Sequence, residues 1–169
     1  MRLIGDDGLE AGPGEIGNLH VSGPTAAIGY WRNREKSVGT FQGEWTVTGD
    51  KYVIDDEGWL TYAGRADDML KVGGIYVSPI EVEEALASHA EVQEAAVVGA
   101  QDADGLVKPS AYVVVHDGVT ATPDLETCLK AHVKAHLAPY KYPRWINFVD
   151  ALPKTATGKI QRFRLRKIE

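Results

Sequence analysis

The stretch Gly64–Glu83, GRADDMLKVGGIYVSPIEVE, lies where the pattern of this sequence changes. Before it, short strand-like runs alternate with turns rich in glycine, proline and aspartate, whereas after it apolar strands alternate with helices. Its last part has the order of a helix start, because Ser78 can cap, Pro79 suits the first turn and Glu81 completes a capping box. The stretch therefore predicts the beginning of a second module of helices and strands.

Downstream of this point, the apolar spacing predicts a compact module that covers residues 65–169. The helix after Ser78 is expected to end near Ser88, and a second helix is expected to run from Pro123 until Pro139 ends it. Apolar, β-branched runs predict three strands, at Val92–Gly99, Ala111–Val115 and Arg144–Val149.

Three polar side chains of the second helix bear on core packing and on metal binding. Cys128 is expected on the apolar side beside Leu125 and Leu129, as a core residue rather than a nucleophile. His132 and His136 form an i, i+4 pair, but no third ligand is evident. We therefore expect both histidines on the helix surface and predict no metal site.

Upstream, residues 1–64 are predicted to be β-rich, with short strands at Ile16–Val21, Trp45–Thr48 and Trp59–Tyr62. Short strands over so few residues bury only a thin core, so we expect this segment to be the edge of a larger domain. The predicted fold class is α+β: a small β-rich segment followed by a compact module like an α/β sandwich.

Charge is unevenly distributed along the chain. The formal net charge is −6, yet residues 139–169 hold eight Lys and Arg against two Asp and Glu. A basic end on an acidic chain indicates a small polyphosphate ligand or a solvated terminus, and the overall acidity argues against nucleic acid. No apolar run reaches the ~20 residues that span a bilayer, and the acidic start has no signal-peptide pattern. The single cysteine excludes an internal disulfide and favours a cytoplasmic protein.

Three short motifs carry groups suited to a nucleotide, and each has a simpler explanation. Asp50, after Thr48-Gly49, can accept hydrogen bonds from both hydroxyls of a ribose, or is only a turn residue. Gly73-Gly74 lets a ligand approach the backbone, or forms a β-turn. The segment YKYPRW, Tyr140–Trp145, can stack an adenine and hold phosphates, or is a strand entry with Trp145 in the core.

The most informative motif is LPKTATGKIQR, Leu152–Arg162, which places Lys159 behind a Thr-Gly turn in the basic end. In isolation, such a lysine indicates only an exposed side chain. In order, however, these motifs resemble the C-terminal motifs of the AMP-forming acyl-CoA synthetases. KVGGIYVSP, YKYPRW and LPKTATGKIQR are most similar to benzoate-CoA ligases and other aryl-CoA ligases. The sequence lacks that family's Ser/Thr/Gly-rich phosphate loop, so the resemblance implies the back third of a larger ligase.

The resemblance assigns a role to each motif. It implies that Asp50 and Arg65 contact the ribose of ATP and of the acyl-AMP, and that Asp67 is the hinge of a mobile C-terminal lid. Residues 1–64 are then the incomplete end of an N-terminal adenylation domain, and residues 65–169 are the lid. Coenzyme A is implied to bind at Lys71, Gly73, Gly74, Tyr140 and Tyr142.

The resemblance makes Lys159 the catalytic residue of the first half-reaction, in which a carboxylate attacks the α-phosphate of ATP. Its ammonium offsets the repulsion between the two anions by roughly 4 kcal/mol, at ~4 Å and an effective dielectric constant near ~20. Mg²⁺ would neutralise the departing pyrophosphate. The same lysine resembles the site that protein lysine acetyltransferases modify in these enzymes, and acetylation removes its charge.

Three functions stay open at this point. The first is the C-terminal part of an ATP-dependent, AMP-forming acid–thiol ligase of the benzoate type, inactive by itself. Its partners are an aryl acid, ATP, coenzyme A and the N-terminal adenylation domain of the same polypeptide. The second is a stand-alone module that binds a nucleotide or coenzyme A, or serves as an acetylation target, without ligase activity. The third is an adenylation domain of peptide synthesis or a luciferase-like enzyme.

Overall fold

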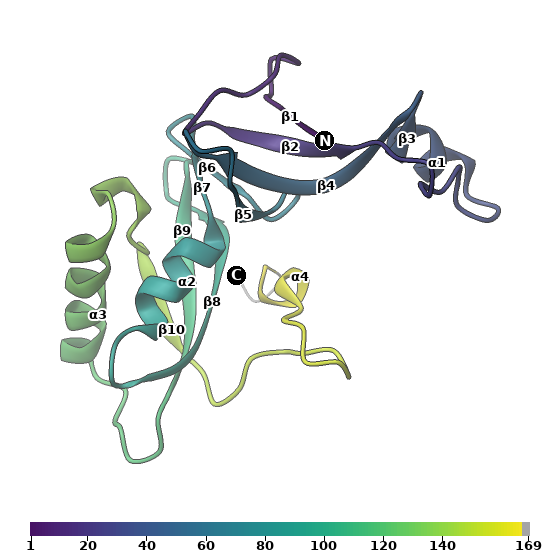
Figure 1. Ribbon diagram of the computed structural model, residues 1–169. Coiled ribbons are helices and arrows are strands. Elements are labelled where there is room, and N and C mark those ends of the chain that lie inside the picture. Colours follow the sequence, from purple (N-terminus) through teal and green to yellow (C-terminus); the bar gives the residue numbers. More distant parts are fainter. Residues whose placement is uncertain (167–169) are drawn as a thin grey trace. The chain divides into compact units, whose positions relative to one another are not determined.

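The computed structural model describes residues 1–166 and divides the chain into two compact units, Met1–Asp67 and Asp68–Glu169 (Figure 1). The last three residues of the predicted module 65–169 lie outside the described part. Both units mix helices and strands, which confirms the predicted fold class. Among the described residues, no helix is long and apolar enough to cross a membrane.

The first unit is a five-stranded antiparallel sheet in the order β1-β2-β4-β3, with β5 also paired to β4. A short helix, α1 (Arg34–Thr40), was not predicted from the sequence. The strands are β1 (Arg2–Ile4), β2 (Ile16–Val21), β3 (Phe41–Gln42), β4 (Trp45–Ile54) and β5 (Leu60–Arg65).

The alternative that Asp50 is only a turn residue is wrong, because β4 continues through Thr48–Asp50. Asn18 pairs with Lys51 and His20 pairs with Val47, so three residues of β4 lie opposite one residue of β2. This is a β-bulge, in which the extra residues re-aim their side chains without ending the strand. The predicted strand Ile16–Val21 is confirmed, whereas the two other predicted strands are longer than expected.

The first unit buries little apolar surface. Its buried hydrophobic side chains are Leu3 and Ala63, and Lys51 is also buried, with its ammonium 3.1 Å from a carboxylate oxygen of Asp6. Large apolar side chains remain open to solvent, namely Ile28 (99% exposed), Trp31 (88%), Val38 (62%) and Trp59 (70%). The expectation of a thin core is therefore confirmed for this unit.

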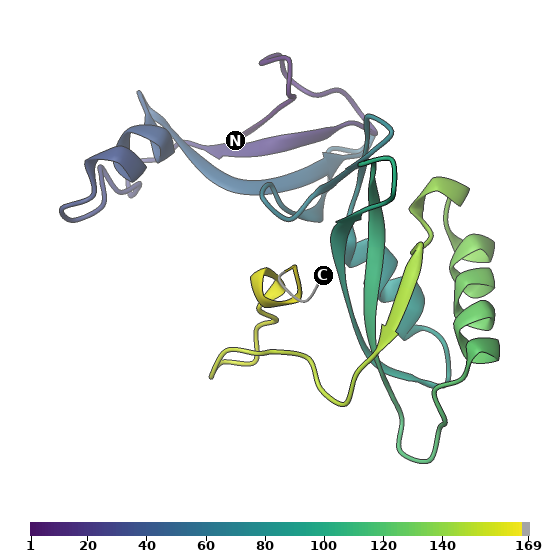
Figure 2. The ribbon, with the colours of Figure 1, turned by 180° about the vertical axis from the view of Figure 1, so that it is seen from behind.

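The second unit is built on a three-stranded sheet in the order β10-β9-β8, where β8 and β9 are antiparallel and β10 is parallel to β9. Figures 1 and 2 show α2 and α3 on one face of this sheet and the C-terminal tail with α4 on the other. The elements are β6 (Leu70–Val72), β7 (Ile75–Val77), α2 (Pro79–Ala87), β8 (Val92–Gln101), β9 (Val107–Val115), α3 (Pro123–His136), the 3₁₀ turn η1 (Pro139–Lys141), β10 (Trp145–Phe148) and α4 (Arg162–Leu165).

Both long helices of this unit begin where the sequence predicts. The hydroxyl of Ser78 accepts a hydrogen bond from the Glu81 N–H (3.3 Å), and the hydroxyl of Thr122 accepts one from the Leu125 N–H (3.2 Å). Each cap is followed by a proline in the first turn, where a missing N–H costs no helical hydrogen bond. The three predicted strands are also confirmed, with β8 and β9 extended at their ends.

Each face of the sheet is packed, which explains why the strands are continuously apolar. Val97 and its same-face neighbours contact a core formed with the side chains of α2 and α3. Ala96 and Val98 point to the opposite face, where they pack with Tyr112, Leu152 and Leu165. The tail is therefore a second covering layer, held by buried apolar side chains and not only by charge.

Two predictions about burial are wrong. Cys128 is exposed rather than in the core, because Leu125, Leu129 and Val133 form the buried stripe of α3 and Cys128 lies on its flank. Trp145 is only half-buried, since the alternation of β10 directs Ile146 into the core instead.

Candidate functional site

Asp50 and Arg65, which are 15 residues apart in the sequence, lie opposite each other on β4 and β5. The Arg65 Nη1 donates to Asp50 Oδ1 at 2.9 Å and to the backbone carbonyl of Thr48 at 3.3 Å. Burial alone would lower the pKa of Arg65, but the hydrogen bond and charge of Asp50 raise it above the ordinary value. The pair stays part-exposed, so Asp50 is held in place while it still faces solvent.

The bulge in β4 makes room for this pair. Gly49 has a φ of +75°, which L side chains adopt only with strain, and a Cβ there would lie 3.1 Å from Arg65 Nη2. The Ala66 N–H donates to the Gly49 carbonyl at 2.9 Å, and the Asp50 N–H donates to the Thr48 hydroxyl at 3.1 Å. The glycine therefore lets the guanidinium lie directly against the strand backbone.

Asp67 closes the first unit. It follows β5 in a turn, its carboxylate lies 3.6 Å from Arg65 Nε, and its side chain is 78% exposed. The division between the two units falls immediately after it, so the residue predicted as the hinge is the last residue of the first unit.

Lys71, Gly73 and Gly74 lie in the hairpin that joins β6 to β7. Gly73 (φ +58°) and Gly74 (φ +88°) are the two central residues of the turn, as the tightest hairpins require. A Cβ at either glycine would meet open space, so the turn presents bare backbone. The Lys71 ammonium lies 5.3 Å from the centre of the Tyr76 ring.

Tyr140 and Tyr142 lie in and just after η1, with cations around the second ring. The Arg144 guanidinium donates to the Tyr142 hydroxyl at 3.3 Å, and the Lys134 ammonium lies 4.0 Å from the ring centre. This hydrogen bond, followed by the charges of Arg144 and Lys134, lowers the pKa of Tyr142. Tyr140 is 40% exposed.

Lys159 lies at the end of a tight loop in the tail. The Thr155 N–H donates to the Lys159 carbonyl at 2.8 Å, and the Lys159 N–H donates to the Thr155 hydroxyl at 3.1 Å. Lys154 and Ile160 form an antiparallel bridge at the base of the loop. In the part of the chain that the structure describes, no carboxylate pairs with the exposed Lys159 ammonium.

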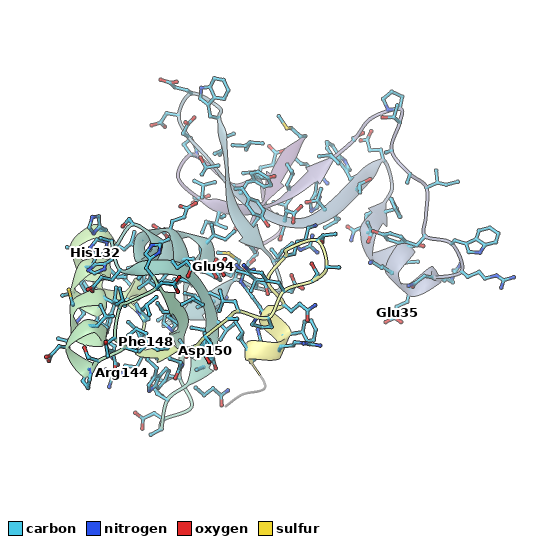
Figure 3. The ribbon with its side chains drawn as sticks, turned by 90° about the horizontal axis from the view of Figure 1, so that it is seen from below. Glu35, Glu94, His132, Arg144, Phe148 and Asp150 are labelled. Atoms are coloured by element: carbon cyan, nitrogen blue, oxygen red, sulfur yellow. The ribbon has the colours of Figure 1, made fainter. Side chains whose placement is uncertain are left out.

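The cations on both sides of Lys159 are already paired. Lys154 contacts Glu94 on β8 at 2.5 Å, and Figure 3 labels that glutamate. Arg162 donates from Nη2 to both oxygens of Glu83 on α2, at 2.9 and 2.7 Å. Sequence reasoning missed the Glu83–Arg162 pair, because nothing local connects two residues that are 79 positions apart.

The described residues contain no group of three or more His, Cys, Asp or Glu that could hold a metal ion. His132 is half-buried and His136 is exposed. The Nε2 of His132 lies 2.8 Å from the Ser88 hydroxyl, so it is engaged within the protein.

Comparisons with known proteins identify similar sequences and structures. Residues 81–159 match the family model of the AMP-binding enzyme C-terminal domain. The chain is 63% identical, over 98% of its length, to the benzoate–CoA ligase of Thauera aromatica, of which it covers 32%. Among solved structures it is similar to the anthranilate CoA ligase AuaEII in complex with anthranoyl-AMP (TM-score 0.92, 51% identity, 99% of this chain, 32% of that one). A benzoate CoA ligase from Burkholderia xenovorans LB400 gives a TM-score of 0.89 and 55% identity, over 98% of this chain and 33% of that one.

Residues 81–159 therefore belong to the family of AMP-binding enzyme C-terminal domains, and the chain as a whole is similar to one third of benzoate- and other aryl-CoA ligases. It spans about a third of the length of the curated relatives it matches. The similar proteins include benzoate- and other aryl-CoA ligases, as the three motifs predicted.

Proposed function

We propose that this chain is the nucleotide-contacting edge and the catalytic lid of an ATP-dependent, AMP-forming aryl-CoA ligase of the benzoate type. The observation that carries the proposal is the state of Lys159. Its loop is closed by hydrogen bonds, the cations on either side are paired with carboxylates, and among residues 1–166 no carboxylate pairs with its own ammonium. A compact charge held in this way suits a reaction in which two anions must meet.

In this proposal, Lys159 acts in the adenylation half-reaction. The substrate carboxylate attacks the α-phosphorus of ATP, the bond to pyrophosphate breaks, and acyl-AMP forms. The ammonium lies between the two anions and lowers the energy of the transition state, where negative charge is most crowded. One such contact contributes roughly 4 kcal/mol at ~4 Å and an effective dielectric constant of ~20. Mg²⁺ accompanies ATP as part of the substrate.

Asp50 and Arg65 serve the nucleotide in the same proposal. Arg65 occupies Oδ1 of Asp50, which leaves the second carboxylate oxygen to accept from a ribose hydroxyl. Asp67, at the division between the units, is the hinge about which residues 68–169 rotate between half-reactions.

The second half-reaction uses another part of the lid. The bare backbone of Gly73-Gly74, with Lys71 beside it, lines the path of the pantetheine arm of coenzyme A. Tyr140 and Tyr142 contact its nucleotide end through their rings and the cations that surround them. The thiol then attacks the acyl carbon and releases AMP.

The partners of this region follow from the same roles. An N-terminal adenylation domain in the same polypeptide supplies the phosphate loop and the pocket for the aryl acid, and it covers apolar side chains such as Trp31 that the first unit leaves exposed. A protein lysine acetyltransferase regulates the enzyme by neutralising Lys159, and the cell compartment is the cytoplasm. Mass spectrometry after incubation with such an acetyltransferase tests the modification, and label at lysines other than Lys159 would contradict it.

The decisive experiment compares Lys159→Ala with Lys154→Ala in the intact ligase. Lys159→Ala should lower benzoate-dependent ATP–pyrophosphate exchange about 10³-fold, because roughly 4 kcal/mol corresponds to three factors of ten. It should leave coenzyme A thioester formation from supplied benzoyl-AMP largely intact. Lys154→Ala is the matched control, since it removes a lysine of the same loop whose exposed ion pair contributes little.

A bulky substitution at Gly74, such as Gly74→Trp, should give the opposite pattern, with thioester formation lost and exchange retained. Equal losses in both half-reactions for both variants would contradict the two-step lid. Normal exchange in Lys159→Ala would contradict the proposed function itself and favour a module that only binds its nucleotide.

A further inference from the structure

A largely buried carboxylate lies at the junction of three elements of the second unit. Glu83, on α2, accepts a hydrogen bond from the backbone N–H of Val97 on β8 at 2.7 Å. It also accepts from Arg162 Nη2, at 2.9 and 2.7 Å to its two oxygens, and from Arg162 Nε at 3.3 Å. The two side chains are 13% and 18% exposed, so water screens this ion pair little.

The contact with Val97 gives Glu83 a fixed reference on the sheet. The strand β8 is an edge strand, because it pairs only with β9 in the three-stranded sheet. An edge strand leaves some backbone N–H groups without a partner on a neighbouring strand. The Glu83 carboxylate accepts a hydrogen bond from one of these groups, the N–H of Val97. Its second role is then to hold the guanidinium of Arg162, three residues beyond Lys159, against that edge.

The same arginine is tied to the start of the unit. Arg162 Nη1 lies 3.9 Å from Asp68 Oδ2, and Arg166 Nη2 lies 2.5 Å from Asp68 Oδ1. Asp68 is the first residue after the division between the units. Ionic contacts therefore join the Lys159 loop to α2, to β8 and to the residue next to the proposed hinge.

Burial raises the pKa of Glu83, and the charge of Arg162 and the Val97 N–H oppose this rise without cancelling it. Stability from this group is therefore greatest below the ordinary glutamate pKa and declines as pH rises through the raised one.

We propose that Glu83 is a positioning residue for adenylation: by holding Arg162 against β8, it fixes the loop that presents the Lys159 ammonium. This inference rests on the proposed function and adds a residue to it. Lysine has a long flexible stem, so the location of its charge depends on how firmly its backbone is held. A displacement of about 1 Å in such a group costs up to ~10²-fold in rate.

The test uses Glu83→Gln in the intact ligase, because glutamine keeps the volume and an acceptor for Val97 but loses the charge that binds Arg162. Adenylation should fall about 10- to 100-fold, while thioester formation from supplied benzoyl-AMP should stay within about twofold. Glu81→Gln is the matched control: it removes a carboxylate of the same helix that pairs with Lys141 and not with the tail. Adenylation should be unchanged in that variant.

A double variant separates positioning from a merely structural role. If Glu83 acts through Lys159, Glu83→Gln should add no further loss of adenylation in a Lys159→Ala background. Hydrogen exchange of the amides from Thr155 to Lys159 should also speed up in Glu83→Gln and not in Glu81→Gln.

Three results would overturn the inference: unchanged adenylation in Glu83→Gln, equal loss of both half-reactions, or a full additional loss in the Lys159→Ala background. Each of these leaves the proposed function intact as long as Lys159→Ala alone abolishes exchange. Normal ATP–pyrophosphate exchange in Lys159→Ala would instead refute the proposed function. That single variant therefore distinguishes a failure of the proposed function from a failure of the Glu83 inference.

Discussion

Leu165→Ala should release the C-terminal tail from the sheet. Leu165 is 1% exposed and belongs to the buried cluster of Leu152, Tyr112 and two β8 side chains, Ala96 and Val98. Removing a fully buried leucine side chain costs about 2–5 kcal/mol. Because α4 has only four residues, its surroundings can partly collapse, so we expect the lower part of this range, about 2–3 kcal/mol.

The assay is thermal and urea unfolding of the 169-residue chain, together with hydrogen exchange of residues 152–166. For a unit of about 100 residues, 1 kcal/mol shifts the midpoint by roughly 4–8 °C, so the second unit should melt roughly 10–20 °C lower. The tail can also detach before the sheet unfolds, in which case its amides exchange faster at temperatures where the sheet is still protected.

Phe163→Ala is the matched control, because Phe163 lies on the same helix but is 56% exposed. Its substitution should change the free energy of unfolding by less than about 0.5 kcal/mol. If Leu165→Ala costs less than about 1 kcal/mol and leaves tail exchange unchanged, or if Phe163→Ala costs as much, the tail is not held by its buried face and the reasoning fails.

Two further predictions concern stability. Burial, followed by the charges of His136 and His89, lowers the pKa of His132, so its contribution to stability is present above the ordinary value and is lost as pH falls. Urea midpoints of the second unit should therefore drop between pH 7.5 and pH 5.5, and a drop of equal size in His132→Gln would contradict this cause. Gly49→Ala should destabilise the first unit by roughly 1–2 kcal/mol and displace Arg65 from Asp50, because its φ is +75°. Gly39→Ala, in α1 where a Cβ meets open space, should be neutral or stabilising, and equal effects of the two alanines in chemical denaturation would refute the strain argument.

Local signals in the sequence predicted the two long helices of the second unit, but not α1 or α4. A capping hydroxyl followed by proline marks the start of α2 and of α3 at Ser78 and Thr122, since these signals act within one turn of the chain. The bulge at Gly49 escaped prediction, because a glycine in a strand and a glycine in a turn look alike without the register of the partner strand. The exposure of Cys128 also escaped, since it lies one residue from the buried stripe of α3.

For the candidate site, too, the sequence predicted some features and not others. Lys159, Asp50 and Arg65 stand in motifs that a reader can find in the sequence, because the residue types and their order are themselves the signal. That Asp50 and Arg65 face each other follows only from the pairing of β4 with β5. Nothing in the sequence states which of the 24 acidic residues meets Arg162.

The sequence by itself determined the family resemblance, the two long helices and three sheet strands of the second unit, and the residues proposed to contact a nucleotide, because these depend on short-range order. Only the tertiary structure decided which of the described cations near Lys159 form ion pairs with carboxylates and which do not. Glu83 and Glu94 neutralise the cations on either side of Lys159 because α2 and β8 bring them there from more than 55 positions away. The availability of one lysine is thus a property of the packed sheet and its covering tail, not of the motif in which that lysine stands.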